Sequence, residues 1–305
     1  MKQRYLLTLA GVAIAVVCAW FVAGRLAADW PEARHALASA STGWLIAGVV
    51  LAAAGMIAIA TGWHATLATL GHRTPIGATL AWYFAGEIGK YLPGGVWPIV
   101  GRAELARRGG VPRSAAYSSV ALSLGLLYLA AALVACVMSP FALDALDGPL
   151  AIVLLVLPVG LICLHPRVMG FAVGVLSRVV RRPLELRTPT FGQALTLVAR
   201  FVPAWLLIGT ATWSLARALD PGAGWGRVVL ATTVSWLAGF AAVPVPGGVG
   251  VREAVFVALA GSLAPGVAVS TAVIARVCFV AVDAMGAAVS ARAASRRPSS
   301  TAPVG

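Results

Sequence analysis

The stretch AGEIGKYLPGGVW, residues 85–97, combines a charged pair and a helix break within a strongly apolar region. Glu87 and Lys90 are three residues apart, so they share one face of a helix and can neutralise each other. Pro93, Gly94 and Gly95 then interrupt the helix, because Pro lacks an N–H and Gly is a poor helix former. Ionisable side chains inside a membrane segment indicate a functional site; the alternative is a structural ion pair.

The whole chain has the composition of a multi-pass membrane protein. Its 305 residues are 60% hydrophobic and 11% charged, with a mean hydropathy of +0.91, whereas soluble proteins carry about 25% charged residues. A chain of this length has too little interior to hide so much apolar surface from water. Lys and Arg in cytoplasmic loops explain the net charge of +13. No nucleic-acid-binding motif accompanies them, so nucleic acid is not an expected partner.

The cysteines and histidines predict neither a metal site nor a disulfide framework. The four cysteines lie far apart in apolar segments, and the four histidines have no metal-ligand spacing. A P-loop, a DxD motif and a Ser-His-Asp order are also missing from the sequence. We therefore expect no metal, no cofactor and no enzymatic activity of this chain alone.

Six apolar segments are expected to cross the membrane as helices, and two further apolar regions are broken by Pro and Gly. The spans lie near 5–24, 44–62, 115–138, 150–164, 195–216 and 267–290, and the broken regions are 76–101 and 228–265. We expect an all-α, polytopic helical bundle that forms one integral membrane domain over residues 1–291. A disordered cytoplasmic tail is expected at 292–305. Tryptophans near the span ends are interpreted as interfacial anchors: Trp63, Trp82, Trp97, Trp205, Trp213, Trp225 and Trp236.

The basic residues predict how the chain lies in the cell membrane. Basic residues at both ends of the chain place the N-terminus and the C-terminus in the cytoplasm. The positions around Arg73 and the segment 102–113 are predicted to be cytoplasmic as well. The segment between them is too short for two full crossings, so we expect a re-entrant hairpin that turns at residues 93–95. Residues 228–266 are compatible with a second re-entrant hairpin or with two full crossings.

The two broken regions carry matching motifs half a chain apart. Residues 85–96 read AGEIGKYLPGGV and residues 238–249 read AGFAAVPVPGGV, so both fit A-G-x6-P-G-G-V with an offset of 153 residues. The flanking residues are also alike: Trp82, Arg102 and Glu104 for the first copy, and Trp236, Arg252 and Glu253 for the second. Paired segments of this kind are typical of inverted repeats in transporters. We therefore predict two inverted halves at about 1–148 and 149–291.

The two breaks together predict an anion-binding site. The N-terminus of a half-helix presents free N–H donors and a partial positive charge, and Arg can hold a phosphate by paired hydrogen bonds. Alternatively, Arg102 is a positive-inside anchor, and Arg276 and Asp283 pair with neighbouring helices. The candidate head-group residues are Glu87, Lys90, Pro93, Gly94, Gly95, Arg102, Pro246, Gly247, Gly248, Arg252 and Glu253, with Glu104, Arg276 and Asp283 as secondary candidates.

The two motifs with their flanks resemble the membrane domain of lysylphosphatidylglycerol synthases. The stretches are GKYLPGGVWPIVGRAELARRGG (residues 89–110) and PVPGGVGVREAVFVALAG (residues 244–261), and the similarity spans essentially the whole chain. In bifunctional members this domain is regarded as a flippase for aminoacylated phospholipid, and a separate cytoplasmic domain charges the lipid from aminoacyl-tRNA. Other members stand alone or are linked to the assembly of polyprenol-bound sugars. Because 15 residues follow residue 290, the resemblance implies lipid handling without aminoacyl transfer.

Three functions are compatible with these observations. The first is a flippase-like protein that binds an anionic phospholipid or a polyprenyl-phosphate-linked lipid between its halves and exposes it alternately. The second is a membrane-embedded transferase for a lipid-linked sugar, with Glu87 or Glu253 as base; the lack of a carboxylate cluster argues against it. The third is a membrane subunit that places a separate cytoplasmic enzyme at the membrane. Assembly into an oligomer is left open.

Overall fold

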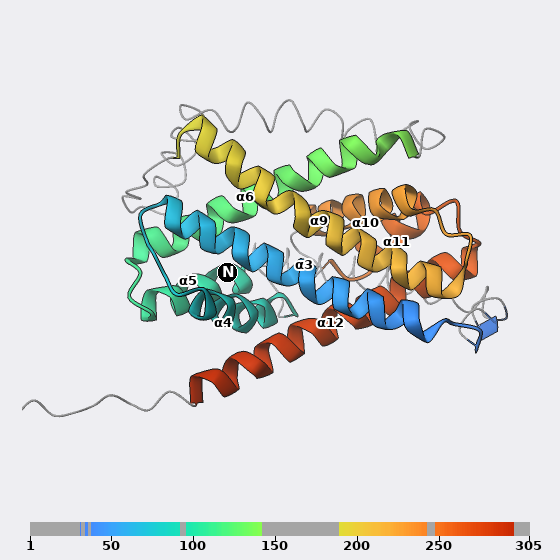
Figure 1. Cartoon of the computed structure of the whole chain (residues 1–305), viewed down its shortest axis with the longest axis horizontal. Coiled ribbons are helices and arrows are strands. Elements are labelled where there is room, and N and C mark those ends of the chain that lie inside the picture. The colour runs from blue at the N-terminus through green and yellow to red at the C-terminus, as the bar shows by residue number, and fades with distance from the viewer. Residues whose placement is uncertain are drawn as a thin grey trace, which may run out of the picture.

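The computed structural model describes residues 31, 34–35, 38–91, 96–141, 189–242 and 248–295, and within these ranges the regular elements are all helical (Figure 1). The predicted spans at 5–24 and 150–164 lie outside the described residues, as do Pro93, Gly94, Gly95, Pro246 and Gly247. The elements are α3 (Thr42–Thr69), α4 (Ile76–Glu87), the 3-10 helix η1 (Ile88–Tyr91), α5 (Trp97–Arg108), α6 (Arg113–Met138), α9 (Phe191–Leu219), α10 (Trp225–Ala241), α11 (Val251–Leu259) and α12 (Pro265–Ser295).

Four described helices are long and apolar enough to cross a membrane: Thr42–Thr69, Arg113–Phe141, Phe191–Leu219 and Pro265–Arg292. They include the predicted spans at 44–62, 115–138, 195–216 and 267–290, which confirms a helical, multi-pass membrane protein. The last helix continues to Ser295, so the predicted disordered tail at 292–305 is wrong for its first four residues. These four residues read Arg-Ala-Ala-Ser, and alanine has the highest helix propensity, so the helix extends beyond the apolar span.

Helices α3 and α9 lie side by side and antiparallel (Figure 1). Glycines at every seventh position of α3 each face a large side chain of α9: Gly48 faces Leu215, Gly55 faces Ile208 and Gly62 faces Phe201. A Cβ atom at these glycines would lie 2.5, 2.8 and 2.3 Å from the facing side chain, respectively. Small residues at a helix contact let the backbones approach closely, which promotes packing in a membrane where water provides no driving force.

Each broken region forms a hairpin of short helices. In the first hairpin, α4 and η1 pack against α5, and in the second, α10 packs against α11. The arms have 12 residues each for α4 and α5, 17 for α10 and 9 for α11. At about 1.5 Å per residue, each arm is shorter than a hydrocarbon core of about 30 Å.

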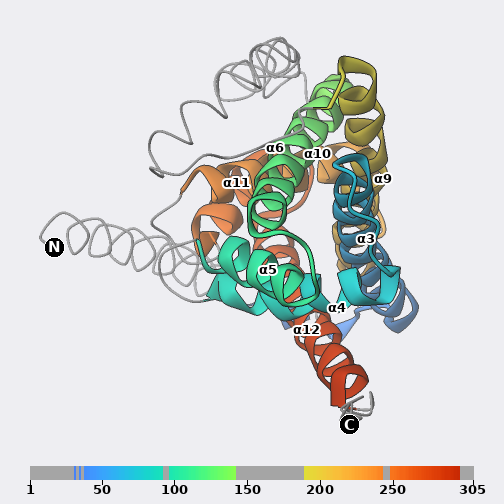
Figure 2. The same cartoon turned by 90° about the vertical axis from the view of Figure 1, so that its left-hand side faces the viewer.

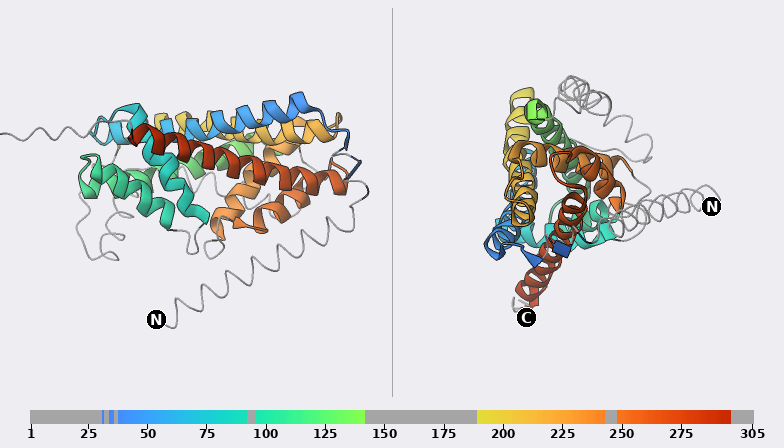
Figure 3. Two further views of the ribbon diagram at one scale, coloured as in Figure 1. Left: turned by 90° about the horizontal axis from the view of Figure 1, so that it is seen from below. Right: turned by 90° about the vertical axis from the view of Figure 1, so that its right-hand side faces the viewer.

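Helix α12 lies against both hairpins. It packs against α4 and η1 of the first hairpin and against α11 of the second. In Figure 1 the first hairpin lies at the left of the molecule and the second at the right, with α12 passing from one to the other. The same helix is seen from its C-terminal end in Figure 2 and along its length in the left panel of Figure 3. One continuous helix therefore connects the two broken regions.

Two of the predicted interfacial tryptophans lie in the protein interior instead. Trp63 and Trp205 are fully buried. The Trp63 indole N–H donates to Ser119 Oγ at 3.0 Å, and the Trp205 indole N–H donates to the Leu127 carbonyl at 2.7 Å. The anchor interpretation is wrong for these two residues, because nearness to a span end does not determine which face of a helix a side chain occupies.

Candidate functional site

Arg102 is buried where the two arms of the first hairpin cross. Its side chain is 4% exposed and lies against Gly86, where a Cβ atom would come within 2.5 Å of Arg102 Cγ. The guanidinium carbon lies 5.3 Å from the centroid of the Tyr83 ring, and Nη2 lies 3.5 Å from Glu87 Oε1. Nε donates a hydrogen bond to the Pro98 carbonyl at 3.2 Å. Arg102 is thus held inside the protein by contacts with the first hairpin.

Arg252 has an equivalent setting in the second hairpin. A Cβ atom at Gly239 would come within 2.3 Å of Arg252 Cγ. The Arg252 guanidinium carbon lies 3.6 Å from the centroid of the Trp236 ring, and such a cation–π contact contributes about 0.5–2 kcal/mol. The ring itself is held edge-to-face by Trp205 and Phe279, with centroids 5.7 and 5.2 Å away.

These contacts repeat at the spacing of the sequence motifs. Gly86 and Gly239 are the glycines of the two A-G pairs, and Tyr83 and Trp236 each stand three residues before them. The sequence comparison paired Trp82 with Trp236 instead. Trp82 packs against the position of Gly109, and Tyr83 contacts the arginine. Any aromatic face can receive a cation, which is why matching by residue identity selected the wrong neighbour.

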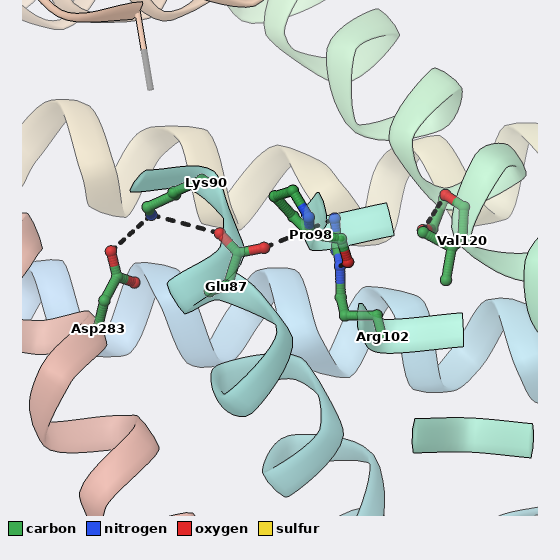
Figure 4. Close-up of polar contacts among 7 residues, drawn as sticks. Glu87, Lys90, Pro98, Arg102, Val120 and Asp283 are labelled. Carbon is green, nitrogen blue, oxygen red and sulfur yellow. Dashed lines mark hydrogen bonds and ion pairs between the residues drawn. The ribbon is translucent and has the colours of Figure 1, made fainter. Parts of the chain in front are cut away.

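Glu87 lies at the centre of a buried ionic cluster in the first hairpin (Figure 4). Lys90 Nζ lies 3.3 Å from Glu87 Oε2 and 2.5 Å from Asp283 Oδ2 of α12. The Asp283 side chain is fully buried. Together with Arg102, these residues bring two carboxylates and two cations into contact. The predicted pairing of Glu87 with Lys90 is confirmed, and so is the pairing of Asp283 with a neighbouring element.

Glu253 makes the corresponding connection in the second hairpin. Its Oε2 accepts a hydrogen bond from the Gly250 N–H at 2.6 Å, and its Oε1 lies 3.3 Å from Arg276 Nη1 of α12. Gly248 and Gly250 have φ angles of 63° and 81°, a region that glycine adopts without steric cost. Glu253 therefore ties the turn before α11 to α12. The predicted interhelical pairing of Arg276 is confirmed.

A small cavity adjoins the second hairpin. It has a volume of about 30 Å³ and is bordered by Arg252, Glu253 and Arg276, which is room for about one water molecule. The hydroxyl-bearing residues Thr212, Thr232 and Ser235 also line it. Among the described residues of its lining, the charged side chains are two arginines and one glutamate.

Glu104 lies away from both clusters. Arg107 Nε and Nη2 donate hydrogen bonds to its carboxylate at 2.8 and 2.7 Å, and Arg108 Nε adds a contact of 3.4 Å. These hydrogen bonds, above all those from Arg107, lower the pKa of Glu104 to about 2. The Glu104 side chain is half-buried, and these contacts do not bring this secondary candidate together with the other site residues.

Tyr128 of α6 lies on a helix that contacts both hairpins. Its ring stacks on Phe240 of α10 with centroids 3.8 Å apart. Helix α6 packs against α5 of the first hairpin and against α10 of the second. Sequence reasoning missed Tyr128, because a tyrosine inside an apolar span has no motif to distinguish it.

A helix begins shortly after each Pro-Gly-Gly motif, α5 at Trp97 and α11 at Val251. Comparison with known families adds one match. Residues 8–285 match the family described as the lysylphosphatidylglycerol synthase TM region. A search of curated proteins found no match. Because the family match covers both hairpins, three of the four long apolar helices described and most of the fourth, the chain belongs to the family of lysylphosphatidylglycerol synthase transmembrane regions.

Proposed function

We propose that this protein binds an anionic lipid head group between its two hairpins and moves the lipid between the leaflets of the cell membrane. The observation that carries the proposal is the equivalent setting of Arg102 and Arg252, each against a glycine and beside an aromatic ring. A guanidinium fixed in this way can hold a phosphate by paired hydrogen bonds. Membership of the family supports a lipid as the ligand.

The position of α6 supports a site shared by both hairpins. Helix α6 packs against α5, which carries Arg102, and against α10, which packs on α11 with Arg252. A head group beside α6 would therefore lie near both hairpins. We expect it to move from one to the other as the lipid crosses.

The charges of the two clusters favour the second hairpin as the stronger anion site. The first cluster contains Glu87, Lys90, Arg102 and Asp283 and is neutral. The cavity beside the second hairpin is bordered by one more positive than negative side chain. Two arginines beside one small cavity can hold a phosphate by paired hydrogen bonds.

Short, paired hairpins suit alternating exposure. In this proposal they are the equivalent parts of two inverted halves and enter the membrane from opposite sides, with both chain termini in the cytoplasm. Rocking of one half against the other would open the head-group site to one leaflet and then to the other. The length of the arms supports re-entry, since none spans about 30 Å.

Native mass spectrometry of the protein purified in mild detergent tests the lipid class. We expect an anionic lipid to co-purify with the wild type and to be depleted in Arg252→Gln. Arg252→Lys should give partial loss, because lysine keeps the charge but not the paired hydrogen bonds. Arg107→Gln is the matched control, since Arg107 is an exposed arginine that pairs with Glu104. Equal lipid occupancy in Arg252→Gln and the wild type would contradict the proposal.

A further inference from the structure

Helix α12 forms one ion pair with each hairpin. Asp283 contacts Lys90 of the first hairpin, and Arg276 contacts Glu253 of the second. Asp283 and Arg276 are seven residues apart, which places them on one face of the helix, about 10 Å apart along its axis. Both contacts therefore act on the same side of a single continuous helix.

The two ion pairs have opposite polarity. The first hairpin supplies the cation and α12 the anion; the second hairpin supplies the anion and α12 the cation. Exchange of partners would bring like charges together, since Lys90 would meet Arg276 and Glu253 would meet Asp283. This arrangement fixes which hairpin binds at which level of α12.

Each ion pair also holds backbone close to a Pro-Gly-Gly motif. Lys90 lies in η1, three residues before Pro93, and its second carboxylate partner, Glu87, contacts Arg102. Glu253 uses its other oxygen to accept the Gly250 N–H in the turn before α11. The position of α12 is therefore transmitted to an arginine in one hairpin and to a turn in the other.

We propose that α12 couples the two hairpins, so that a displacement of one is passed to the other through these two ion pairs. Removing Asp283 leaves Lys90 paired with Glu87 but breaks its contact with α12, and breaking a buried ion pair is strongly destabilising locally. Loss of either pair should therefore loosen both hairpins, although each pair touches only one. The coupling itself needs no lipid. That it serves to open and close the two halves of a lipid site together rests on the proposed function.

Hydrogen exchange read out by mass spectrometry, on the full chain in lipid nanodiscs, tests the coupling. In Asp283→Asn we expect backbone amides to exchange roughly tenfold faster or more both in η1 and in residues 248–253. Glu253→Gln keeps an oxygen that can accept the Gly250 N–H. In this variant we also expect faster amide exchange in both η1 and residues 248–253. Val277→Ala is the control on α12, since Val277 is 63% exposed beside Arg276 and should change neither region.

A purely local response would overturn the coupling. In that case the backbone amides of η1 in Asp283→Asn would exchange faster, while those of residues 248–253 would exchange at the wild-type rate. If that variant does not fold, the double variant Lys90→Met/Asp283→Asn removes both charges together. Wild-type exchange at 248–253 in the double variant would likewise overturn the proposal. Lipid occupancy of Arg252→Gln is measured separately, so failure of the coupling and failure of the lipid site are distinguishable.

Discussion

Gly239 and Arg252 lie so close together that a single added methyl group at Gly239 would come within 2.3 Å of Arg252 Cγ. Gly86 and Arg102 have the same relationship, with a corresponding distance of 2.5 Å. In both hairpins, therefore, the glycine of the A-G pair makes room for an arginine side chain from the opposite arm. In the second hairpin, Gly248 of the Pro-Gly-Gly motif lies against the same two residues.

Substitution of this glycine should displace the arginine. In Gly239→Ala the new methyl group forces Arg252 away from Trp236, and overpacking of this kind costs about 1–3 kcal/mol. We expect lipid occupancy, measured by native mass spectrometry, to fall by about fivefold to a hundredfold. Gly125→Ala is the matched control, because a Cβ atom at this helical glycine of α6 meets nothing within 4 Å. Wild-type occupancy in Gly239→Ala would show that the close approach is irrelevant to binding.

The Trp236 ring beside Arg252 should support lipid binding through its cation–π contact rather than through its volume. Trp236→Leu removes the cation–π contact, which contributes about 0.5–2 kcal/mol, so the dissociation constant for anionic lipid should rise by about 2- to 30-fold. Trp236→Phe keeps a ring and should retain most of the affinity. A titration of lipid into both variants distinguishes them. Equal affinities for the Phe and Leu variants would argue that the ring acts only by filling space.

The sequence was sufficient to predict features that depend on residue identity and spacing. The four long helices, the two broken regions and the arginine that follows each were predicted in this way, as was the pairing of Glu87 with Lys90. Contacts between distant segments were only partly predictable. Asp283 was expected to pair between helices, but its partner Lys90 depends on how α12 packs against the first hairpin. Periodicity does not encode that packing.

Close packing of α3 against α9 should depend on the heptad-spaced glycines. Gly55→Ala would bring a methyl group within 2.8 Å of Ile208 Cγ1 and 3.3 Å of the Ile208 backbone nitrogen. We expect the substitution to destabilise the protein by about 1–3 kcal/mol, seen as a lower midpoint of thermal unfolding in detergent. Gly43→Ala, in the first turn of the same helix, meets nothing within 4 Å and serves as the control. A midpoint for Gly55→Ala equal to that of the control would contradict the proposed packing role.

Glu104 should influence stability at the protein surface and have no effect on lipid handling. Because its folded-state pKa is lowered from 4.5 to about 2 by Arg107, its stabilising contribution is complete above the ordinary pKa and is lost as the pH falls toward 2. The difference in thermal stability between the wild type and Glu104→Gln should therefore shrink on acidification. Lipid translocation by Glu104→Gln should equal that of the wild type at neutral pH. A slower rate would mean that the surface cluster takes part in transport.

The central claim is that Arg252 holds an anionic head group while the lipid crosses the membrane. The most direct measurement is the rate at which labelled phosphatidylglycerol moves between leaflets of liposomes that contain the purified protein. We predict rapid movement with the wild type and with Arg107→Gln, and a rate roughly tenfold lower or more with Arg252→Gln, as expected for loss of at least about 1.4 kcal/mol of binding. Movement at the wild-type rate in Arg252→Gln liposomes would contradict the account.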